Sequence, residues 1–404
     1  MKTNSNLRED GDESLFPAKR RYPREDERSS LMNGTRRVTR AAWVDTAKGI
    51  AIFLVVLFHA SLFLLDAGVQ GGPWRAKVAL ELFPVPAFFL LAGITSFRIV
   101  GFSFPDLWRR RLLPLLYLYV VWSVVRFVFY LVVPTSNSGL GDLPADDPRS
   151  LLLLLVWPSS SYWFLHALVV FTALAWLIRR LPVAVQLGAA AVVSALTTSG
   201  LLDLHNTGWN RIAGLFVVFL IGVRLRGRIV DAVEGTRAIA IVPLAAALAG
   251  VIAGMLLWDV EDIPGVVLVG QLLGVSLGLV VARAVAGWRP AAFLEGWGAR
   301  SLHIYVLHLF VIVPVTSLVE LSGWSPPRIV GAILQVALAV GAILVSLALM
   351  RWTRRARWLY VPPRSWVRRS SKAPPRRIRA DDASSSAART EALPARRDEE
   401  PGDD

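Results

Sequence analysis

The sequence has no cysteine among its 404 residues. This absence excludes disulfides, a thiol nucleophile and cysteine-ligated zinc or iron-sulfur sites, so redox chemistry by the protein's own side chains is excluded too. Charged residues are few, at 18%, and they cluster in the two tails and in short runs between apolar segments. That distribution excludes an ordinary soluble enzyme. The chain also contains no repeat of fixed length and no Walker, Rossmann or metalloprotease motif.

Hydrophobic residues, by contrast, are abundant. They make up 54% of the chain, and the mean hydropathy is +0.50, values typical of a protein whose solvent is the lipid bilayer. The formal net charge of +14 would favour a nucleic-acid partner in a soluble chain. Here the arginines flank apolar segments, where they set membrane topology. We therefore expect the bilayer as a partner and no nucleic acid.

About ten segments are apolar enough, at about 20 residues each, to cross a bilayer as helices. Their ranges are 43–65, 78–97, 112–133, 162–178, 183–202, 209–223, 238–258, 264–284, 302–321 and 329–350. The sequence therefore predicts an all-α, polytopic integral membrane protein with about ten transmembrane helices. A further apolar segment, 151–157, is too short to span and precedes Pro158 and three serines. We expect it to be interfacial or re-entrant.

Basic residues near the ends of spans favour the cytoplasmic side of the membrane. Alternate loops carry arginine clusters, and the intervening loops carry acidic residues. The basic set is Arg36, Arg37, Arg40, Arg98, Arg109 to Arg111, Arg179, Arg180, Arg224, Arg226, Arg228, Arg351, Arg354 and Arg355; the acidic set is Asp66, Asp142, Asp146, Asp147, Asp203, Asp259, Glu261 and Asp262. This alternation predicts that both termini are cytoplasmic.

The composition also predicts the organisation of the chain. Residues 1–40 and 359–404 are rich in charged residues, serine and proline, so we expect disordered cytoplasmic tails on either side of a transmembrane domain at 41–358. The first apolar run contains Asp45, Lys48 and His59, which a cleavable signal would lack. The strong preference for arginine over lysine is typical of a GC-rich bacterial genome, which indicates a bacterial plasma membrane.

Ionisable residues inside a span are costly and are functional candidates. Lys48 and His59 are eleven residues apart, which places them within roughly 20° on one helix face and roughly 16 Å apart along the axis. Asp45 lies on the same stripe. An ordinary interfacial ion pair remains the alternative interpretation of Asp45 and Lys48. His59 lies deeper, where an imidazole that titrates near neutrality is suited to act as a general base toward a hydroxyl.

Other intramembrane candidates are Glu81, His166, Arg211, Tyr305 and His308. Glu81 and Arg211 lie near the outer ends of their spans, where solvation explains each one alone. Tyr305 and His308 share a helix face with Ser301, which predicts that they line one cavity, although a packing histidine fits equally. Trp163, in the segment SSSYWFLHAL, fits a sugar-binding platform or an aromatic belt at the membrane interface.

Several segments resemble, in order, the motifs of the integral membrane acyltransferase 3 family, and in particular its branch similar to fucose 4-O-acetylases. The most specific is DTAKGIAIFLVVLFH at 45–59. The others are FPVPAFFLLAG at 83–93, RRRLLPLLYLYVVWS at 109–123, YWFLHAL at 162–168, FLIGVRL at 219–225 and SLHIYVLH at 301–308. The family's motif before the Phe-Phe run often contains a histidine, whereas this chain has Pro84 and Val85, and Ala92 replaces the usual serine before Gly93. These departures suggest a different acceptor.

The resemblance implies an acyl-CoA-dependent O-acyltransferase, usually an acetyltransferase, with no metal and no permanently bound cofactor. The donor would be cytoplasmic acyl-CoA, and the acceptor a hydroxyl of a carbohydrate, glycolipid or similar molecule of the cell envelope. By the same resemblance, His59 would be the catalytic histidine, Lys48 would occupy the family's basic position and contact CoA, and Arg109 and Arg111 would hold the CoA phosphates. Our leading hypothesis adds Asp45 and Lys48 to the catalytic residues, because they would position the donor. It also assigns the acceptor contacts to Trp163, Asn210, Arg211, Tyr305 and His308.

Two other classes of protein remain as alternatives. Ten spans with intramembrane charges are also typical of a transporter or flippase for a lipid-linked or small polar solute. The absence of a detectable repeat between the two halves of the chain counts against that class. A non-catalytic sensor of lipid or sugar is the third class, and the retention of His59 counts against it.

Overall fold

A computed structural model describes residues 25–71, 77–133, 144, 146–158 and 161–367. All regular secondary structure in these residues is helical. The chain divides into two compact units, Met1–Pro362 and Pro363–Asp404, and the described part of the second contains one short helix, α17 (Arg364–Val367). Most of the predicted C-terminal tail, and residues 1–24 of the predicted N-terminal tail, lie outside the described residues.

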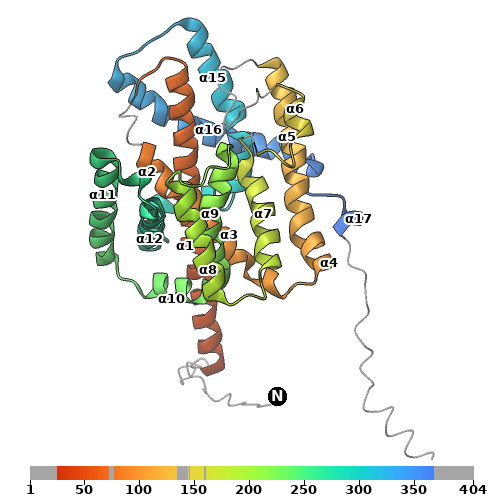
Figure 1. The fold of residues 1–404 in the computed structure, drawn as a ribbon, viewed down its shortest axis with the longest axis vertical. Helices are drawn as coiled ribbons and strands as arrows, with labels where there is room; N and C mark the ends of the chain where they lie inside the picture. Colours follow the sequence, from red (N-terminus) through yellow and green to blue (C-terminus); the bar gives the residue numbers. More distant parts are fainter. Residues whose placement is uncertain (1–24, 72–76, 134–143, 145, 159–160, 368–404) are drawn as a thin grey trace, which may run out of the picture. The chain divides into compact units, whose positions relative to one another are not determined.

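The first unit is built from long apolar helices joined by short ones (Figure 1). The long helices are α1 (Glu25–Asp66), α3 (Pro84–Ser96), α5 (Leu113–Val132), α7 (Trp163–Leu177), α8 (Val183–Thr198), α9 (Thr207–Arg224), α11 (Ile241–Trp258), α12 (Val266–Val285), α15 (Leu309–Ser322) and α16 (Arg328–Thr353). The short ones include α2 (Lys77–Leu82), α4 (Phe104–Leu107), η3 (Trp108–Leu112), α6 (Arg149–Leu152), α10 (Arg226–Gly235), η5 (Val260–Asp262), α13 (Ala292–Gly298) and α14 (Ser301–Leu307). Helix α1 packs against α3, α12, α13, α15 and α16.

Seven helical stretches among the described residues are long and apolar enough to cross a membrane. They are Ala42–Asp66, Leu80–Gly101, Phe104–Val132, Ala238–Trp258, Val266–Val285, Ser301–Ser322 and Arg328–Thr353, and α7 and α8 are apolar but shorter. Over its described residues the chain is therefore all-helical, with the features of a multi-pass membrane protein. The total of ten spans stays a prediction, because α7, α8 and α9 do not meet the same criteria of length and hydropathy.

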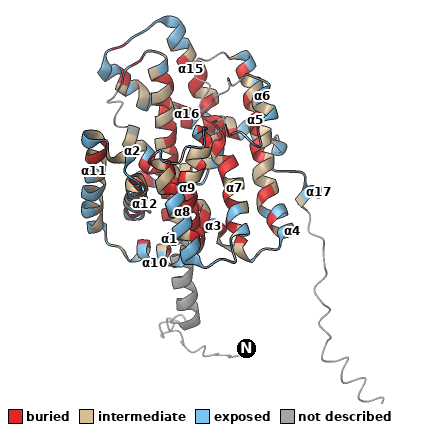
Figure 2. Cartoon of the chain, viewed as in Figure 1, coloured by how far each residue is buried: buried red, intermediate tan, exposed pale blue. Residues whose placement is uncertain are grey.

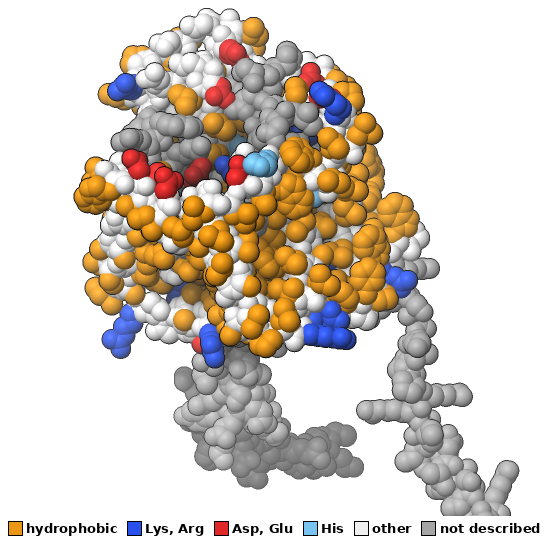
Figure 3. All heavy atoms as spheres, in the orientation of Figure 1, with side chains coloured by type: hydrophobic (Ala, Val, Ile, Leu, Met, Phe, Trp, Pro, Cys, Tyr) orange, Lys and Arg blue, Asp and Glu red, His pale blue; other side chains and the backbone are white. Residues whose placement is uncertain are grey.

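The surface of this unit fits a lipid solvent. Helix α11 is composed almost wholly of apolar residues, yet most of them are exposed or half-buried (Figure 2), including Val242 and Leu257. On the face drawn in Figure 3, a broad band of hydrophobic side chains separates acidic side chains, which lie mainly above it, from basic side chains along the lower edge. Exposed apolar side chains in a continuous band are costly in water and favourable against lipid tails.

Three boundaries differ from the sequence prediction. Helix α1 begins at Glu25, so helix extends into the segment 1–40 for which composition predicts disorder. The predicted span 112–133 continues back through η3 and α4 to Phe104. The predicted span 302–321 is divided at His308 into α14 and α15, because the His308 ring bonds to the backbone carbonyls of the preceding turn.

The segment 151–157 forms the end of α6 and a following turn. Its backbone carbonyls accept hydrogen bonds from side chains of longer helices: Tyr119 Oη donates to Leu154 O at 2.8 Å, and Trp209 Nε1 donates to Val156 O at 3.0 Å. His166 Nε2 donates to Leu155 O at 3.0 Å. Irregular backbone near a membrane needs such partners, so His166 supports this turn.

Candidate active site

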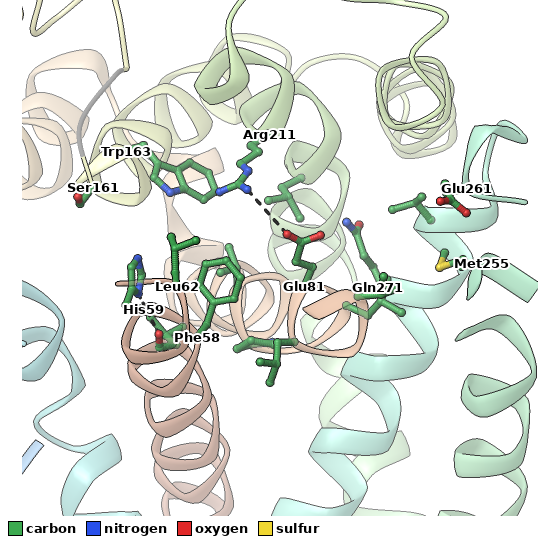
Figure 4. A pocket seen from close by; sticks show the side chains of 18 of the residues that line it. Phe58, His59, Leu62, Glu81, Ser161, Trp163, Arg211, Met255, Glu261 and Gln271 are labelled. Carbon is green, nitrogen blue, oxygen red and sulfur yellow. Dashed lines mark hydrogen bonds and ion pairs between the residues drawn. The ribbon is translucent and has the colours of Figure 1, made fainter. Parts of the chain in front are cut away.

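A cavity of about 450 Å³ lies between α1, α2, α3, α7, α9, α11 and α12 (Figure 4). This volume falls within the roughly 300–1,000 Å³ range of small-molecule sites. Most of the wall is apolar. The side chains with polar groups on it are His59, Glu81, Ser161, Trp163, Arg211, Glu261 and Gln271. Polar groups converging on an apolar cavity are typical of a binding or catalytic site.

The imidazole of His59 has a defined tautomer in this cavity. Its Nδ1 lies 2.9 Å from Val55 O, one turn earlier on α1. A carbonyl oxygen only accepts hydrogen bonds, so Nδ1 carries the proton of the neutral ring. The lone pair is therefore on Nε2, and His59 offers a proton acceptor to a molecule in the cavity.

His308 lies directly behind His59. The His308 ring is 1% exposed, its Nε2 is 3.4 Å from His59 Nδ1, and the two ring centroids are 5.0 Å apart. His308 Nδ1 donates to Tyr305 O at 2.8 Å, which leaves its Nε2 as an acceptor by the same argument. The proton on His59 Nδ1 is thus shared between Val55 O and His308 Nε2, and His308 orients His59.

Tyr305 also lies behind the wall. Its hydroxyl donates to Ser161 O at 2.9 Å, and neither Tyr305 nor His308 lines the cavity. The prediction that both residues line one cavity therefore differs from the structure, because α14 turns these side chains toward α7 and α1. Tyr305 supports the loop that carries Ser161.

Arg211, Trp163 and Glu81 meet on one wall, although they come from α9, α7 and α2 (Figure 4). Arg211 lies 4.0 Å from a Glu81 carboxylate oxygen, and its Cζ is 5.8 Å from the centroid of Trp163. In the sequence, contact with water at the outer end of a span is enough to explain Glu81 or Arg211 taken alone. The fold instead brings the two side chains together as an ion pair. Trp163 and Arg211, which the sequence predicts as acceptor contacts, both line the cavity, and their contact with an acceptor stays a prediction.

Asn210 has a different position. It donates from Nδ2 to Asp203 Oδ1 at 2.7 Å and accepts from Leu204 N at 2.8 Å, outside the cavity. The hydrogen bond from Asn210 lowers the pKa of the Asp203 carboxyl, because it stabilises the charged form. Asn210, predicted as an acceptor contact, therefore does not line the cavity. Its side-chain amide instead holds the loop before α9.

The residues predicted to hold the donor lie away from the cavity. Lys48 Nζ is 3.4 Å from Asp45 Oδ1, and both side chains are partly exposed. Arg109 is exposed, and Arg111 donates to Thr95 O at 3.1 Å near the end of α3. None of these four residues lines the cavity.

Close packing fixes the Asp45–Lys48 end of α1. A Cβ at Gly49 would overlap with the Leu294 carbonyl, and a Cβ at Gly298 would overlap with the Asp45 carbonyl. Only glycine allows the backbones of α1 and α13 to approach this closely. The glycine of the segment DTAKG is thus a packing residue.

The sequence reasoning missed Gln271 and Glu261 as wall residues, whereas the wall residue Ser161 belongs to the segment SSSYWFLHAL, which the sequence places with Trp163. Gln271 is a primary amide inside an apolar helix, and a search that included neutral polar side chains would have found it. Pro84 and Val85, the departures from the expected motif, also line the cavity. They lie where α2 gives way to α3, so the changed motif borders the cavity.

A comparison with family models matches residues 41–351 to the acyltransferase domain of the acyltransferase 3 family. No curated protein and no solved structure matches the chain. The matched range contains the whole cavity and every described residue of the candidate site.

Proposed function

This chain belongs to the acyltransferase 3 family, and from that premise we propose that it moves an acyl group, most simply acetyl, from cytoplasmic acyl-CoA to a hydroxyl of a carbohydrate, glycolipid or similar acceptor of the cell envelope. The observation that carries the proposal is His59, whose Nδ1 proton is engaged by Val55 O and whose ring lines the cavity. The fucose 4-O-acetylase-like branch is part of the same proposal.

In the proposed mechanism, His59 Nε2 accepts the proton of the acceptor hydroxyl as its oxygen attacks the thioester carbonyl. A C–O bond forms, the C–S bond breaks, and the CoA sulfur leaves with the proton that His59 accepted. Between the uptake of this proton and its return to the sulfur, the imidazolium remains hydrogen-bonded through Nδ1 to Val55 O and His308 Nε2. An acyl-histidine intermediate is the other route that the same imidazole permits.

The donor would reach His59 from the opposite end of α1. Lys48, Arg109 and Arg111 offer cationic donors to the CoA phosphates, with Asp45 positioning Lys48. The long pantetheine arm would span the distance from these residues to His59. Ten spans, both termini in the cytoplasm and a bacterial plasma membrane complete the proposal, since the donor and the arginine-rich loops would then share one side.

The test is transfer of label from radioactive acetyl-CoA to the host's envelope fraction, catalysed by membranes that contain the protein. We expect the wild type to label an envelope component and His59→Ala to label none. The matched control is His205→Asn, which removes an exposed imidazole from an outer loop where φ is 55°, a conformation that asparagine tolerates.

Transfer by the control but not by His59→Ala would support the proposal, and the labelled product would identify the acceptor. Equal transfer by His59→Ala and the wild type would contradict the role of His59. If no acyl-CoA, from acetyl to longer chains, gave transfer with folded protein, the proposal would fail and a transporter would become the better explanation.

A further inference from the structure

The cavity has two ends with different chemistry (Figure 4). His59, Ser161 and Trp163 lie at one end, and Glu261 and Met255 lie at the other. Glu81 lies between the two ends, and Gln271 lies on the side of Glu81 that faces Glu261. The proposed reaction uses only the His59 end. The other end has polar groups that the reaction does not use.

Gln271 is the buried polar residue of this second end. It lies in α12, is 7% exposed and lines the cavity. Its Oε1 is inaccessible and has no hydrogen-bond partner among the described residues. A buried amide oxygen without a partner costs roughly 1–3 kcal/mol. When the amide turns Oε1 toward the cavity, a ligand that donates a hydrogen bond to this oxygen removes that cost.

Glu261 adds a second acceptor on the wall. It lies in η5, between α11 and α12, and its Oε2 is also inaccessible and without a partner in the described part of the chain. Together, Glu81, Arg211 and Glu261 give the cavity wall a formal charge of −1 (one cation, two anions). An anionic group placed beside Glu261 would be repelled.

From these contacts we infer that the Gln271–Glu261 end is a second subsite, which binds a part of the acceptor that donates hydrogen bonds and bears no negative charge. Sugar hydroxyls and an ammonium group both have this chemistry, because each offers donors to carboxylate and amide oxygens. The inference deepens the proposed function. It rests on the proposed function only where it assigns the bound group to the acceptor. Binding at this subsite would fix which hydroxyl reaches His59.

The test measures binding, so it does not depend on acyl transfer. The full chain in phospholipid nanodiscs is dialysed against radiolabelled methyl glucoside, methyl glucosaminide or methyl glucuronide. These three probes place a neutral hydroxyl, an amine or a carboxylate on the same ring. The variants are Glu261→Gln, Gln271→Leu and the matched control Asp262→Asn, which removes the neighbouring exposed carboxylate on the same element.

We expect the wild type to bind the glucoside and the glucosaminide at least about tenfold more tightly than the glucuronide. In Glu261→Gln, the affinity for the glucuronide should rise toward the affinity for the glucoside. In Asp262→Asn, the difference between these two affinities should stay as in the wild type. Gln271→Leu should lower the affinity for the glucoside and for the glucosaminide about tenfold. A tighter glucosaminide than glucoside would identify an ammonium as the preferred group.

The inference is overturned if the glucuronide binds the wild type as tightly as the glucoside, if Glu261→Gln and Asp262→Asn behave alike, or if no probe binds. Unliganded thermal unfolding of each variant shows that it is folded. Binding with the expected selectivity, together with no transfer in the envelope assay, would uphold the subsite and reject the proposed function.

Discussion

Residues 45–49 and residues 55–59 belong to the same helix, α1, but have different surroundings. The first group packs backbone to backbone on α13 through Gly49 and Gly298. The second group faces the cavity, where His59 is held by Val55 O and backed by His308. One continuous segment, DTAKGIAIFLVVLFH, therefore combines a packing contact with a chemical group.

The residues of this segment are required for two different reasons. Gly49 is required by the space between two backbones, and its replacement should act on stability. His59 is required by its basic nitrogen, and its replacement should act on the reaction. Substitutions at the two ends of the segment should therefore affect different properties, stability at Gly49 and transfer at His59.

The largest expected effect is at the cavity end. Glutamine at position 59 can still donate a hydrogen bond to Val55 O but has no nitrogen that takes up a proton, so His59→Gln should lower kcat by about 100-fold or more. Acetyl transfer kinetics in nanodiscs measure this loss. The unfolding midpoint should stay within a few degrees of the wild type, and a large fall in the midpoint would mean that His59 is mainly structural.

At the other end of α1, Gly49→Ala should destabilise the protein by about 1–3 kcal/mol, because the new methyl group overlaps with the Leu294 carbonyl. Thermal unfolding in nanodiscs measures the change. The control is Gly250→Ala on α11, where a Cβ meets no atom within 4 Å and the alanine should be neutral or stabilising. Equal effects of the two substitutions would show that the α1–α13 contact is looser than described.

His308→Leu tests whether the second histidine positions the first. Losing one of the two acceptors of the His59 Nδ1 proton should lower kcat by up to about tenfold, since one neutral hydrogen bond contributes roughly 0.5–1.5 kcal/mol. The KM for acetyl-CoA should not change, because His308 does not touch the cavity. Steady-state kinetics at varied acetyl-CoA separate the two constants, and a rise in KM with unchanged kcat would argue against a positioning role.

The smallest effect is expected far from α1. Tyr119→Phe removes the hydrogen bond to Leu154 O and should cost about 1 kcal/mol of unfolding free energy. The transfer rate per folded molecule should be unchanged. Denaturant or thermal unfolding checks the first statement, and a selective loss of transfer would instead link segment 151–157 to the reaction.

Much of the fold was predictable because lipid imposes simple rules on sequence. Apolar length marked the helices, and the short segment 151–157 was recognised as unable to span. The break at His308 was not predicted, because it depends on a side chain bonding to its own helix backbone. The number of spans stays a prediction for α7 to α9, which are too short or too polar for length and hydropathy to decide.

The site was predictable only in part. The spacing of charged residues in the first span identified His59 as a candidate, and the aromatic-rich segment SSSYWFLHAL identified Trp163; both line the cavity. The pairing of Glu81 with Arg211 could not be predicted from either span alone, because it joins α2 to α9. Arg126 does not line the cavity, but it is an intramembrane charge that the sequence reasoning missed inside a predicted span; it is buried, with its Cζ 4.8 Å from the Tyr130 ring centroid.

The most direct test of the account is the sidedness of the donor and its dependence on His59. Proteoliposomes of known orientation would receive radiolabelled acetyl-CoA on one side only, with the envelope acceptor in the membrane. We predict transfer only when acetyl-CoA faces the arginine-bearing ends of the helices, and a rate lower by about 100-fold or more with His59→Gln. Transfer from the opposite side, or transfer by His59→Gln at the wild-type rate, would contradict a reaction in which the donor enters along α1 to meet the acceptor at His59.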